Sequence, residues 1–321
     1  MATMVERLRK MNTTFIINGG AGRVIAAIPA LEKFHRLNPK NDFRVIVHGW
    51  QDLYWSHPIL QPRTIGIHQK NIFEEYVKNY NLVCPEPYYI HDYYNQKISL
   101  AEAFDRQINN TTDHKDLEKP NLYISTYERT SVQRIVEEFK QIHKKNKVVV
   151  FQPYGSTMTI SNNRPYDISN RSLDVDDYLK IGKFLNDKDC LIFFFGNREL
   201  KHPGDNFSAD LTNFNPELRM YMALISECDY FVGCDSVGQH MARAFDKPGS
   251  VFMGSTFEKN VSYPDHFKFF RKQGQDPVYS PIRLGGVESD FTDRLNDGIM
   301  NFSANEINES CQVILKDIYD E

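Results

Sequence analysis

The sequence predicts an open α/β protein with two domains. At 321 residues the chain is longer than a single hydrophobic core usually grows, so two domains of roughly 150 residues are expected. In each half, a short apolar run leads through a glycine-containing turn into a segment with helical spacing of its apolar residues. The fully apolar run 191–195, closed by Gly196, is typical of a central parallel strand buried on both faces.

Composition excludes several classes of protein. The net charge of −4 gives no general attraction to nucleic acid or to anionic membranes, so any contact with DNA has to be local. The five cysteines are scattered without a CxxC motif, which indicates reduced thiols rather than a disulfide scaffold or a zinc site. No apolar run approaches the roughly 18 residues of a membrane span. Residues 1–10 lack the apolar core of a signal peptide and are expected to be a frayed leader on a soluble, cytoplasmic and monomeric protein.

Residues 11–146 are predicted to form the first domain. A strand at 15–18 leads into the turn of Gly19, Gly20 and Gly22 and then into a helix, in which Pro29 removes one hydrogen bond. This turn is neither a Walker loop nor a complete dinucleotide fingerprint. A second strand is expected at 43–47, and helices at 100–108 and 131–143.

Aromatic and acidic residues follow two of the expected strand ends. Ligands of open α/β sheets bind beyond the carboxyl ends of the strands, so these residues are candidates for binding an acceptor. The alternative is that they pack a large surface loop. The candidates are Trp50, Asp52, Trp55, Tyr88 and Tyr89.

Residues 147–303 are predicted to form the second domain. The chain is expected to form strands at 148–151 and 191–195, helices at 175–185 and 216–227, and a loop that carries Arg164 and Arg171. Within this half, residues 229–256 predict a complete β-α-β unit, with strands at 230–232 and 250–253 and a helix at 239–245. Free N–H groups at the start of such a helix favour a phosphate, and His240 lies in its first turn. Cys234 is interpreted as a packed thiol.

Two blocks of sequence, 20–31 and 232–242, resemble the heptosyltransferase-like glycosyltransferases of family 9, particularly the branch encoded by T4-like bacteriophages. The second block looks like the donor-phosphate loop of that family. Residues 152–157 stand where the family has a histidine-proline-glycine loop, and Arg171 stands where it has a lysine. The resemblance implies the GT-B fold, in which two Rossmann-like domains face each other across a cleft, with the C-terminal segment 304–321 crossing back onto the N-terminal domain.

The resemblance also implies a binding site for a nucleotide-sugar donor. Arg171 would neutralise the diphosphate as it leaves, and Gly196 would let the base approach. The full set implied for donor binding is Gly155, Ser156, Thr157, Arg171, Gly196, Asp235, Ser236, Val237, Gly238, Gln239 and His240.

The chain departs from the family at the catalytic base. Arg23 stands where the family has an aspartate, and a protonated guanidinium cannot abstract a proton. Either Arg23 holds an anion, such as a donor or acceptor phosphate, or the base has moved to Glu86, Asp92 or Asp52. Glu86 is the first choice because two prolines flank it, and it is expected to be buried among aromatic rings. No second carboxylate completes an aspartate-x-aspartate motif at Asp235, so no metal and no cofactor are expected.

The expected activity is inverting transfer of a sugar, a pentose such as arabinose or a hexose, from a nucleotide-sugar. The favoured acceptor is the hydroxyl of a hydroxymethylated cytosine in phage DNA, flipped out of the duplex onto aromatic rings. The alternatives are transfer to a lipopolysaccharide core and a non-catalytic module that binds a nucleotide-sugar or nucleic acid. A serine hydrolase is disfavoured because Cys234 stands where a nucleophile elbow needs glycine.

Overall fold

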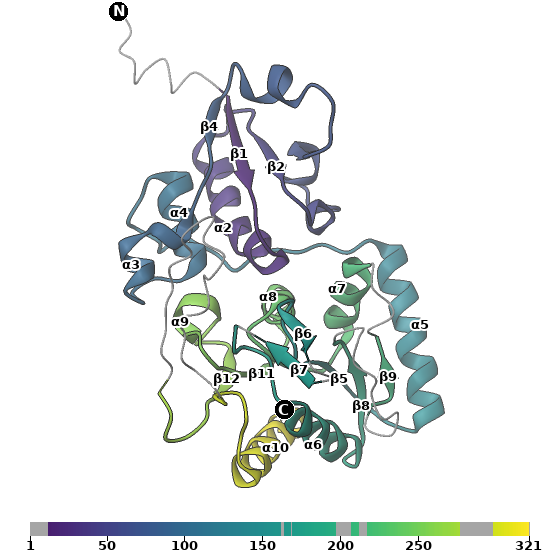
Figure 1. The fold of residues 1–321 in the computed structure, drawn as a ribbon. Coiled ribbons are helices and arrows are strands. Elements are labelled where there is room, and N and C mark those ends of the chain that lie inside the picture. Colours follow the sequence, from purple (N-terminus) through teal and green to yellow (C-terminus); the bar gives the residue numbers. More distant parts are fainter. Residues whose placement is uncertain are drawn as a thin grey trace, which may run out of the picture. The chain divides into compact units, whose positions relative to one another are not determined.

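A computed structural model describes residues 12–161, 164–167, 169–196, 207–211, 217–276 and 298–320. The chain divides into two compact units, Met1–Ile124 and Ser125–Glu321 (Figure 1). The expected leader lies outside the described residues. The predicted domain boundary at 146/147 differs from this division, because helix α5 (Thr126–His143) packs on helix α7 (Leu218–Glu227) of the second unit.

The first unit contains a four-stranded parallel sheet in the order β3-β2-β1-β4. In register, Phe15 lies opposite Val45 on one side and Val83 on the other. The strands are β1 (Thr13–Ile17), β2 (Arg44–Val47), β3 (Thr64–Gly66) and β4 (Asn81–Val83). Because β1 and β4 are neighbours, the chain leaves β1 toward β2 on one side and returns to its other side at β4. The order of strands therefore reverses between β1 and β4.

Helix α2 (Ala21–Leu37) supplies most of the core of this unit, since nearly every residue from Ala21 to Phe34 is buried. It packs on α4 (Leu100–Asn109), which begins with a capping box formed by Ser99 and Glu102. Shorter helical segments lie at Gln51–Tyr54 (η1), Gln61–Arg63 (η2), Phe73–Val77 (η3), Pro87–Tyr89 (η4) and His91–Tyr94 (α3).

The second unit contains a six-stranded parallel sheet in the order β12-β11-β10-β5-β8-β9. The strands are β5 (Lys147–Gln152), β8 (Cys190–Phe194), β9 (Ala209–Asp210), β10 (Tyr230–Cys234), β11 (Gly249–Phe252) and β12 (Phe267–Phe270). Three strands run outward from β5 on one side and three from β10 on the other, which is the doubly wound order of dinucleotide-binding folds. The order of strands reverses between β5 and β10.

Helices cover both faces of this sheet. Alternate sheet residues such as Val149 and Phe151 face the core that contains α6 (Val175–Asn186) and α10 (Ala304–Tyr319). On the opposite face, Phe193 packs on Phe139 of α5, and α7 packs on α8 (Val237–Ala244) (Figure 1). The apolar side chains of α10 (Ile307, Cys311, Ile314 and Ile318) are buried in the core of the second unit. That face of α10 is thus used within the second unit, and the packing of residues 304–321 on the N-terminal domain stays a prediction.

Two further elements differ from the sequence-based expectation. The loop expected to carry Arg164 contains an antiparallel hairpin of β6 (Met158–Ser161) and β7 (Arg164–Asp167). Between residues 256 and 304, where the sequence patterns above predict no helix or strand, the chain contains the short helix α9 (Glu258–Val261) and the edge strand β12. The basic-aromatic segment 266–272 therefore contains a strand of the sheet, and its Lys268 pairs with Asp317 of α10.

Candidate functional site

The predicted donor-binding residues gather where β5 and β10 end side by side. These strands are parallel neighbours, with Phe151 opposite Val232 and Gln152 opposite Gly233. The turn with Gly155 follows β5, and the turn with Asp235 and Ser236 follows β10 and leads into α8. This is the point at which the order of strands reverses, where open α/β sheets bind their ligands.

Gln152, which the sequence analysis did not single out as a site residue, joins the two turns. Its Oε1 accepts hydrogen bonds from the Gly238 N–H at 2.9 Å and the Tyr221 hydroxyl at 3.0 Å. Its Nε2 donates to Ser236 Oγ at 3.1 Å. The Ser236 side chain makes no capping hydrogen bond to α8, so the amide of Gln152 takes that role from another strand. A Cβ at Gly238 would lie 2.4 Å from Gln152 Oε1, so only glycine fits there.

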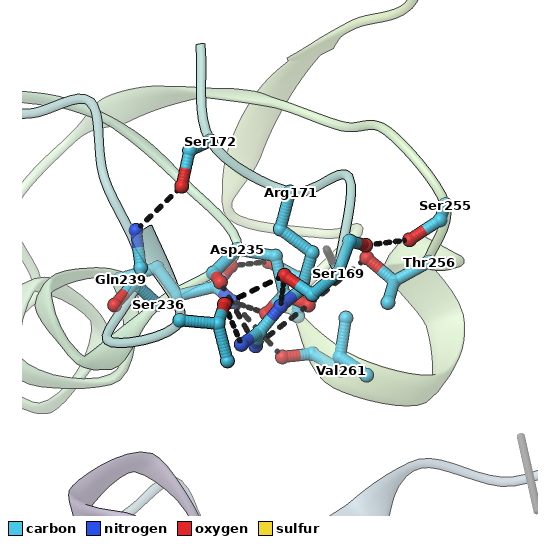
Figure 2. A network of polar contacts seen from close by, with 12 residues as sticks. Ser169, Arg171, Ser172, Asp235, Ser236, Gln239, Ser255, Thr256 and Val261 are labelled. Atoms are coloured by element: carbon cyan, nitrogen blue, oxygen red, sulfur yellow. Dashed lines mark hydrogen bonds and ion pairs between the residues drawn. The ribbon is translucent and has the colours of Figure 1, made fainter. Parts of the chain in front are cut away.

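Asp235 and Gln239 are committed to hydrogen bonds inside the protein (Figure 2). Asp235 Oδ1 accepts from Gln239 Nε2 at 2.7 Å, and Oδ2 accepts from Thr256 Oγ1 at 2.9 Å. Gln239 also donates to the Val261 carbonyl at 3.2 Å, and its own oxygen accepts from Ser262 Oγ. These two side chains fix the β10–α8 turn against the segment after β11.

Arg171 lies beside both turns. Its Nε donates to Ser169 Oγ at 3.0 Å, and its Nη1 donates to the Asp235 carbonyl at 3.3 Å and lies 3.8 Å from the Asp235 carboxylate (Figure 2). A Cβ added at Gly155 would lie 3.6 Å from Arg171 Nη2, so the guanidinium borders the turn after β5 as well. Its side chain is 17% exposed, which leaves a fixed cation within reach of a ligand at this edge.

A second residue missed by the sequence analysis, Asp167, orders the segment that carries Arg171. Its carboxylate accepts from Thr157 Oγ1 at 2.7 Å, from Ser169 Oγ at 2.6 Å and from the Ser172 N–H at 3.0 Å. Burial raises the pKa of Asp167, but the hydrogen bonds from Ser169, Ser172 and Thr157 outweigh burial and lower it. Asp167 is therefore a buried, charged anchor for this loop.

His240 is buried in the first turn of α8, and its Nδ1 lies 2.8 Å from the Tyr263 hydroxyl. Burial lowers the pKa of His240 to about 4, although the charge of Asp235 opposes this shift. The imidazole is therefore neutral near pH 7 and offers a ligand a hydrogen bond rather than a positive charge.

The remaining donor candidates lie at the same edge. Ser156 is exposed in the turn after β5, and Val237 is the first residue of α8. Gly196 follows β8, where a Cβ would lie 2.3 Å from the ring of Phe194. Cys234 is buried, which raises the pKa of its thiol and fits its interpretation as a packing residue.

In the first unit, Arg23 and Glu86 form an ion pair. Arg23 Nη1 donates to Glu86 Oε1 at 2.8 Å, and Nη2 donates to Glu86 Oε2 at 3.1 Å. Arg23 follows β1 and Glu86 follows β4, so the pair lies at the second strand reversal of the molecule. The expectation that Glu86 is buried among aromatic rings is wrong, because its side chain is 34% exposed. The anion in contact with Arg23 is the Glu86 carboxylate, and the binding of a substrate phosphate by Arg23 stays a prediction.

The other predicted first-unit residues lie on two separate loops. Trp50, Asp52 and Trp55 follow β2, whereas Tyr88, Tyr89 and Asp92 follow β4. The exposed fractions of Trp50, Trp55 and Tyr89 are 45%, 51% and 56%. Asp92 accepts a hydrogen bond from Arg106 Nη1 at 2.6 Å, which lowers its pKa and makes it a weak base.

No protein-family model and no curated protein sequence matches the chain. Among solved structures, Escherichia coli ADP-heptose LPS heptosyltransferase II is 14% identical, with 85% of this chain and 95% of that chain covered at a TM-score of 0.60. A glycosyltransferase family 9 protein from Veillonella parvula is 12% identical, with 96% and 98% covered at a TM-score of 0.64. The chain has the GT-B fold. The E. coli heptosyltransferase WaaC with ADP, 12% identical over 94% of this chain and 97% of that chain, gives a TM-score of 0.53.

Metal binding and membrane spanning were considered for the described part of this GT-B chain. No group of three or more histidine, cysteine, aspartate or glutamate side chains is arranged there to hold a metal ion. One structural neighbour, the glycosyltransferase TibC from enterotoxigenic E. coli, is named as iron-containing (12% identity, 96% and 80% covered, TM-score 0.54). Among the same residues, no helix combines the length and apolarity needed to cross a membrane.

Proposed function

We propose that the chain is a glycosyltransferase that uses a nucleotide-sugar, with the donor diphosphate bound at the carboxyl ends of β5 and β10. The observation that carries this proposal is the position of Arg171, whose guanidinium borders both turns at the strand reversal. A charge-assisted hydrogen bond to phosphate is strong and would stabilise the leaving diphosphate.

The proposed reaction inverts the anomeric centre. The acceptor hydroxyl attacks the anomeric carbon, its O–H bond breaks, and the proton passes to the Glu86 carboxylate. The bond between the anomeric carbon and the phosphate oxygen breaks, and the nucleoside diphosphate leaves with the electron pair beside Arg171. None of these steps assigns a role to a metal ion.

For the acceptor we propose a hydroxymethylated cytosine in DNA. The exposed rings of Trp50, Trp55 and Tyr89 support this choice, since bases stack on aromatic side chains. The segment 266–272 does not add to it, because Lys268 pairs with Asp317 and Arg271 pairs with Glu258. The alternative acceptor is a lipopolysaccharide-type saccharide, as the name of the E. coli heptosyltransferase II suggests.

The test is to incubate the protein with ADP-heptose, UDP-glucose and UDP-arabinose, each with hydroxymethylated DNA, with a lipopolysaccharide core or with no acceptor. Free nucleoside diphosphate reports turnover, and mass spectrometry of the digested nucleosides reports the product. A base mass increased by one sugar supports the DNA acceptor, and transfer to the saccharide alone overturns it. Binding of a donor without turnover in any mixture would identify a non-catalytic module instead.

A further inference from the structure

We infer that Arg23 is a positioning residue, which holds the carboxylate of Glu86 oriented at the carboxyl edge of the first sheet. This inference rests on the proposed function, in which Glu86 takes the proton from the acceptor hydroxyl. It assigns a partner to the arginine that stands where a base is expected.

The place of the pair in the fold supports a ligand-binding role. Arg23 lies in the first turn of α2, directly after β1, and Glu86 lies directly after β4. Strands β1 and β4 are the neighbours between which the order of strands reverses. In an open α/β sheet, this is where a crevice for ligands forms. The donor residues of the second unit occupy the corresponding position beyond β5 and β10.

Several contacts hold the end of the Arg23 side chain. Both terminal nitrogens bind the Glu86 carboxylate, and Nη2 also donates to the Pro85 carbonyl at 3.0 Å. The guanidinium carbon lies 4.9 Å from the ring centre of Tyr88 and 5.6 Å from that of Phe104, whereas the buried Nε has no hydrogen-bond partner among the described residues. The anion in contact with Arg23 is therefore the Glu86 carboxylate.

Burial separates the roles of the two partners. Arg23 is 8% exposed, whereas the Glu86 side chain is 34% exposed, so the cation is internal and the carboxylate reaches solvent. The Glu86 backbone is also held, because Gln107 Nε2 donates to its carbonyl at 3.1 Å. A carboxylate oriented by a buried cation and open to solvent on its other side is suited to accept a proton from a bound hydroxyl.

Other charges near this pair are already matched. Three helices provide them: α2 and α4, which pack together, and α3, which packs on η4 and α4. The pairs are Lys33 with Asp105, and Arg106, Lys97 and His91 with Asp92, while Glu102 caps α4. Arg23 is thus the cation in direct contact with Glu86.

The test measures kcat and KM for the donor and acceptor pair found active in the assay above. Arg23→Met removes both contacts to the Glu86 carboxylate, so we expect kcat near pH 7 to fall at least tenfold while KM for the donor changes less than threefold. Arg23→Lys keeps a charge without the two-point contact and should give an intermediate kcat.

The matched control is Lys33→Met, since Lys33 is another buried cation of α2, 6% exposed and paired with Asp105 at 3.0 Å. It should lose stability in the same way as Arg23→Met but keep the parental kcat. A parental kcat in Arg23→Met, or an equal fall of kcat in Lys33→Met, overturns the inference. Full activity of Glu86→Gln also overturns it. A parent with no turnover in any mixture refutes the proposed function instead, so the two failures are distinguishable.

Discussion

At the scale of single residues, the second unit places one cation where a diphosphate would lie. Arg171 is held by Ser169 and by the Asp235 carbonyl, and Asp167 fixes the segment that carries it. A side chain held in this way loses little conformational entropy when a ligand binds. The positive charge at this edge is therefore preorganised.

We predict that Arg171→Ala lowers turnover at least tenfold, which corresponds to a loss of about 1.4 kcal/mol of transition-state stabilisation. The reason is that charge builds up on the diphosphate as the bond to the sugar breaks. Release of nucleoside diphosphate measures the effect. Lys183→Ala, which removes a cation from the surface of α6, is the control and should be neutral. Parental kinetics in Arg171→Ala would remove this residue from the site.

A second prediction concerns Gly238, where an added Cβ would lie 2.4 Å from Gln152 Oε1 and 2.7 Å from the Tyr221 hydroxyl. Gly238→Val should therefore break the contact between the two turns and weaken binding of ADP or UDP at least tenfold, with some loss of stability. Gly20→Ala tests a glycine of the other unit with nothing within 4 Å of its Cβ, and should bind nucleotide normally. Titration calorimetry gives both affinities, and unchanged binding in Gly238→Val would refute the placement of the donor.

At the scale of elements, the sequence predicts the helices and strands that are marked by a local pattern of apolar residues. The apolar run of β8 and the helical spacing of α6 place these two elements within one residue of their observed limits. The start of α5 is missed, although Ser125 and Glu128 form a capping box that is readable in the sequence. Edge strand β12 is missed because its outward lysine interrupts the apolar run, and its contacts come from β11.

The residues of the candidate site also fall into those that local patterns predict and those that depend on distant partners. Glycines and small polar residues after strands predict the turns at 155–157 and 235–238, and Arg171 contacts both turns through Thr157 and the Asp235 carbonyl. Gln152 and Asp167 are missed because their roles depend on partners brought in by the fold. The hydrogen bond from Gly238 to Gln152 spans 86 residues of sequence. Nor does any local pattern pair Arg23 with Glu86, which are 63 residues apart.

The ion pair between α5 and α7 provides a pH-dependent prediction at this scale. Arg219 Nε and Nη2 donate to Glu128 at 2.5 and 2.6 Å. Burial raises the pKa of Glu128, but hydrogen bonds from Arg219 and Ser125 outweigh burial and lower it to about 2, from 4.5. A pKa lowered by folding contributes stability above the unfolded value, and this contribution is lost as pH falls toward the folded value.

Glu128→Gln should therefore cost about 1–3 kcal/mol of unfolding free energy at pH 7, since it leaves Arg219 without its charged partner. The difference from the parent should shrink as pH falls from 4.5 toward 2, the interval between the two pKa values. Urea unfolding at several pH values measures it. Glu137→Gln, on an exposed part of α5, is the control. A difference that stays constant with pH would contradict the role given to this ion pair.

At the scale of the whole molecule, the two units share one arrangement of strands. The main sheet of each unit is parallel and reverses its strand order once. At each reversal lies a largely buried arginine that donates to a carboxylate or to a carbonyl oxygen. The two sites differ in their contacts. Arg171 donates to a backbone carbonyl and a hydroxyl and lies 3.8 Å from the Asp235 carboxylate, whereas both terminal nitrogens of Arg23 bind Glu86. The first arrangement suits an anionic donor, and the second suits proton transfer from an acceptor.

Hydrogen exchange on the full-length protein tests whether the donor nucleotide binds in the second unit. ADP or UDP at about 100 times its Kd should stabilise the unit that binds it by about 2.7 kcal/mol, because a ligand that binds only the folded state shifts the folding equilibrium. Exchange should slow in peptides that contain Gln152, Arg171 and Asp235–Gly238, and stay unchanged in peptides that contain Arg23 and Glu86. Arg171→Ala at the same nucleotide concentration is the control, and should lose most of the protection. Protection centred on Arg23 would place the diphosphate in the first unit, and would contradict both the donor site and the role of Arg23 in holding Glu86.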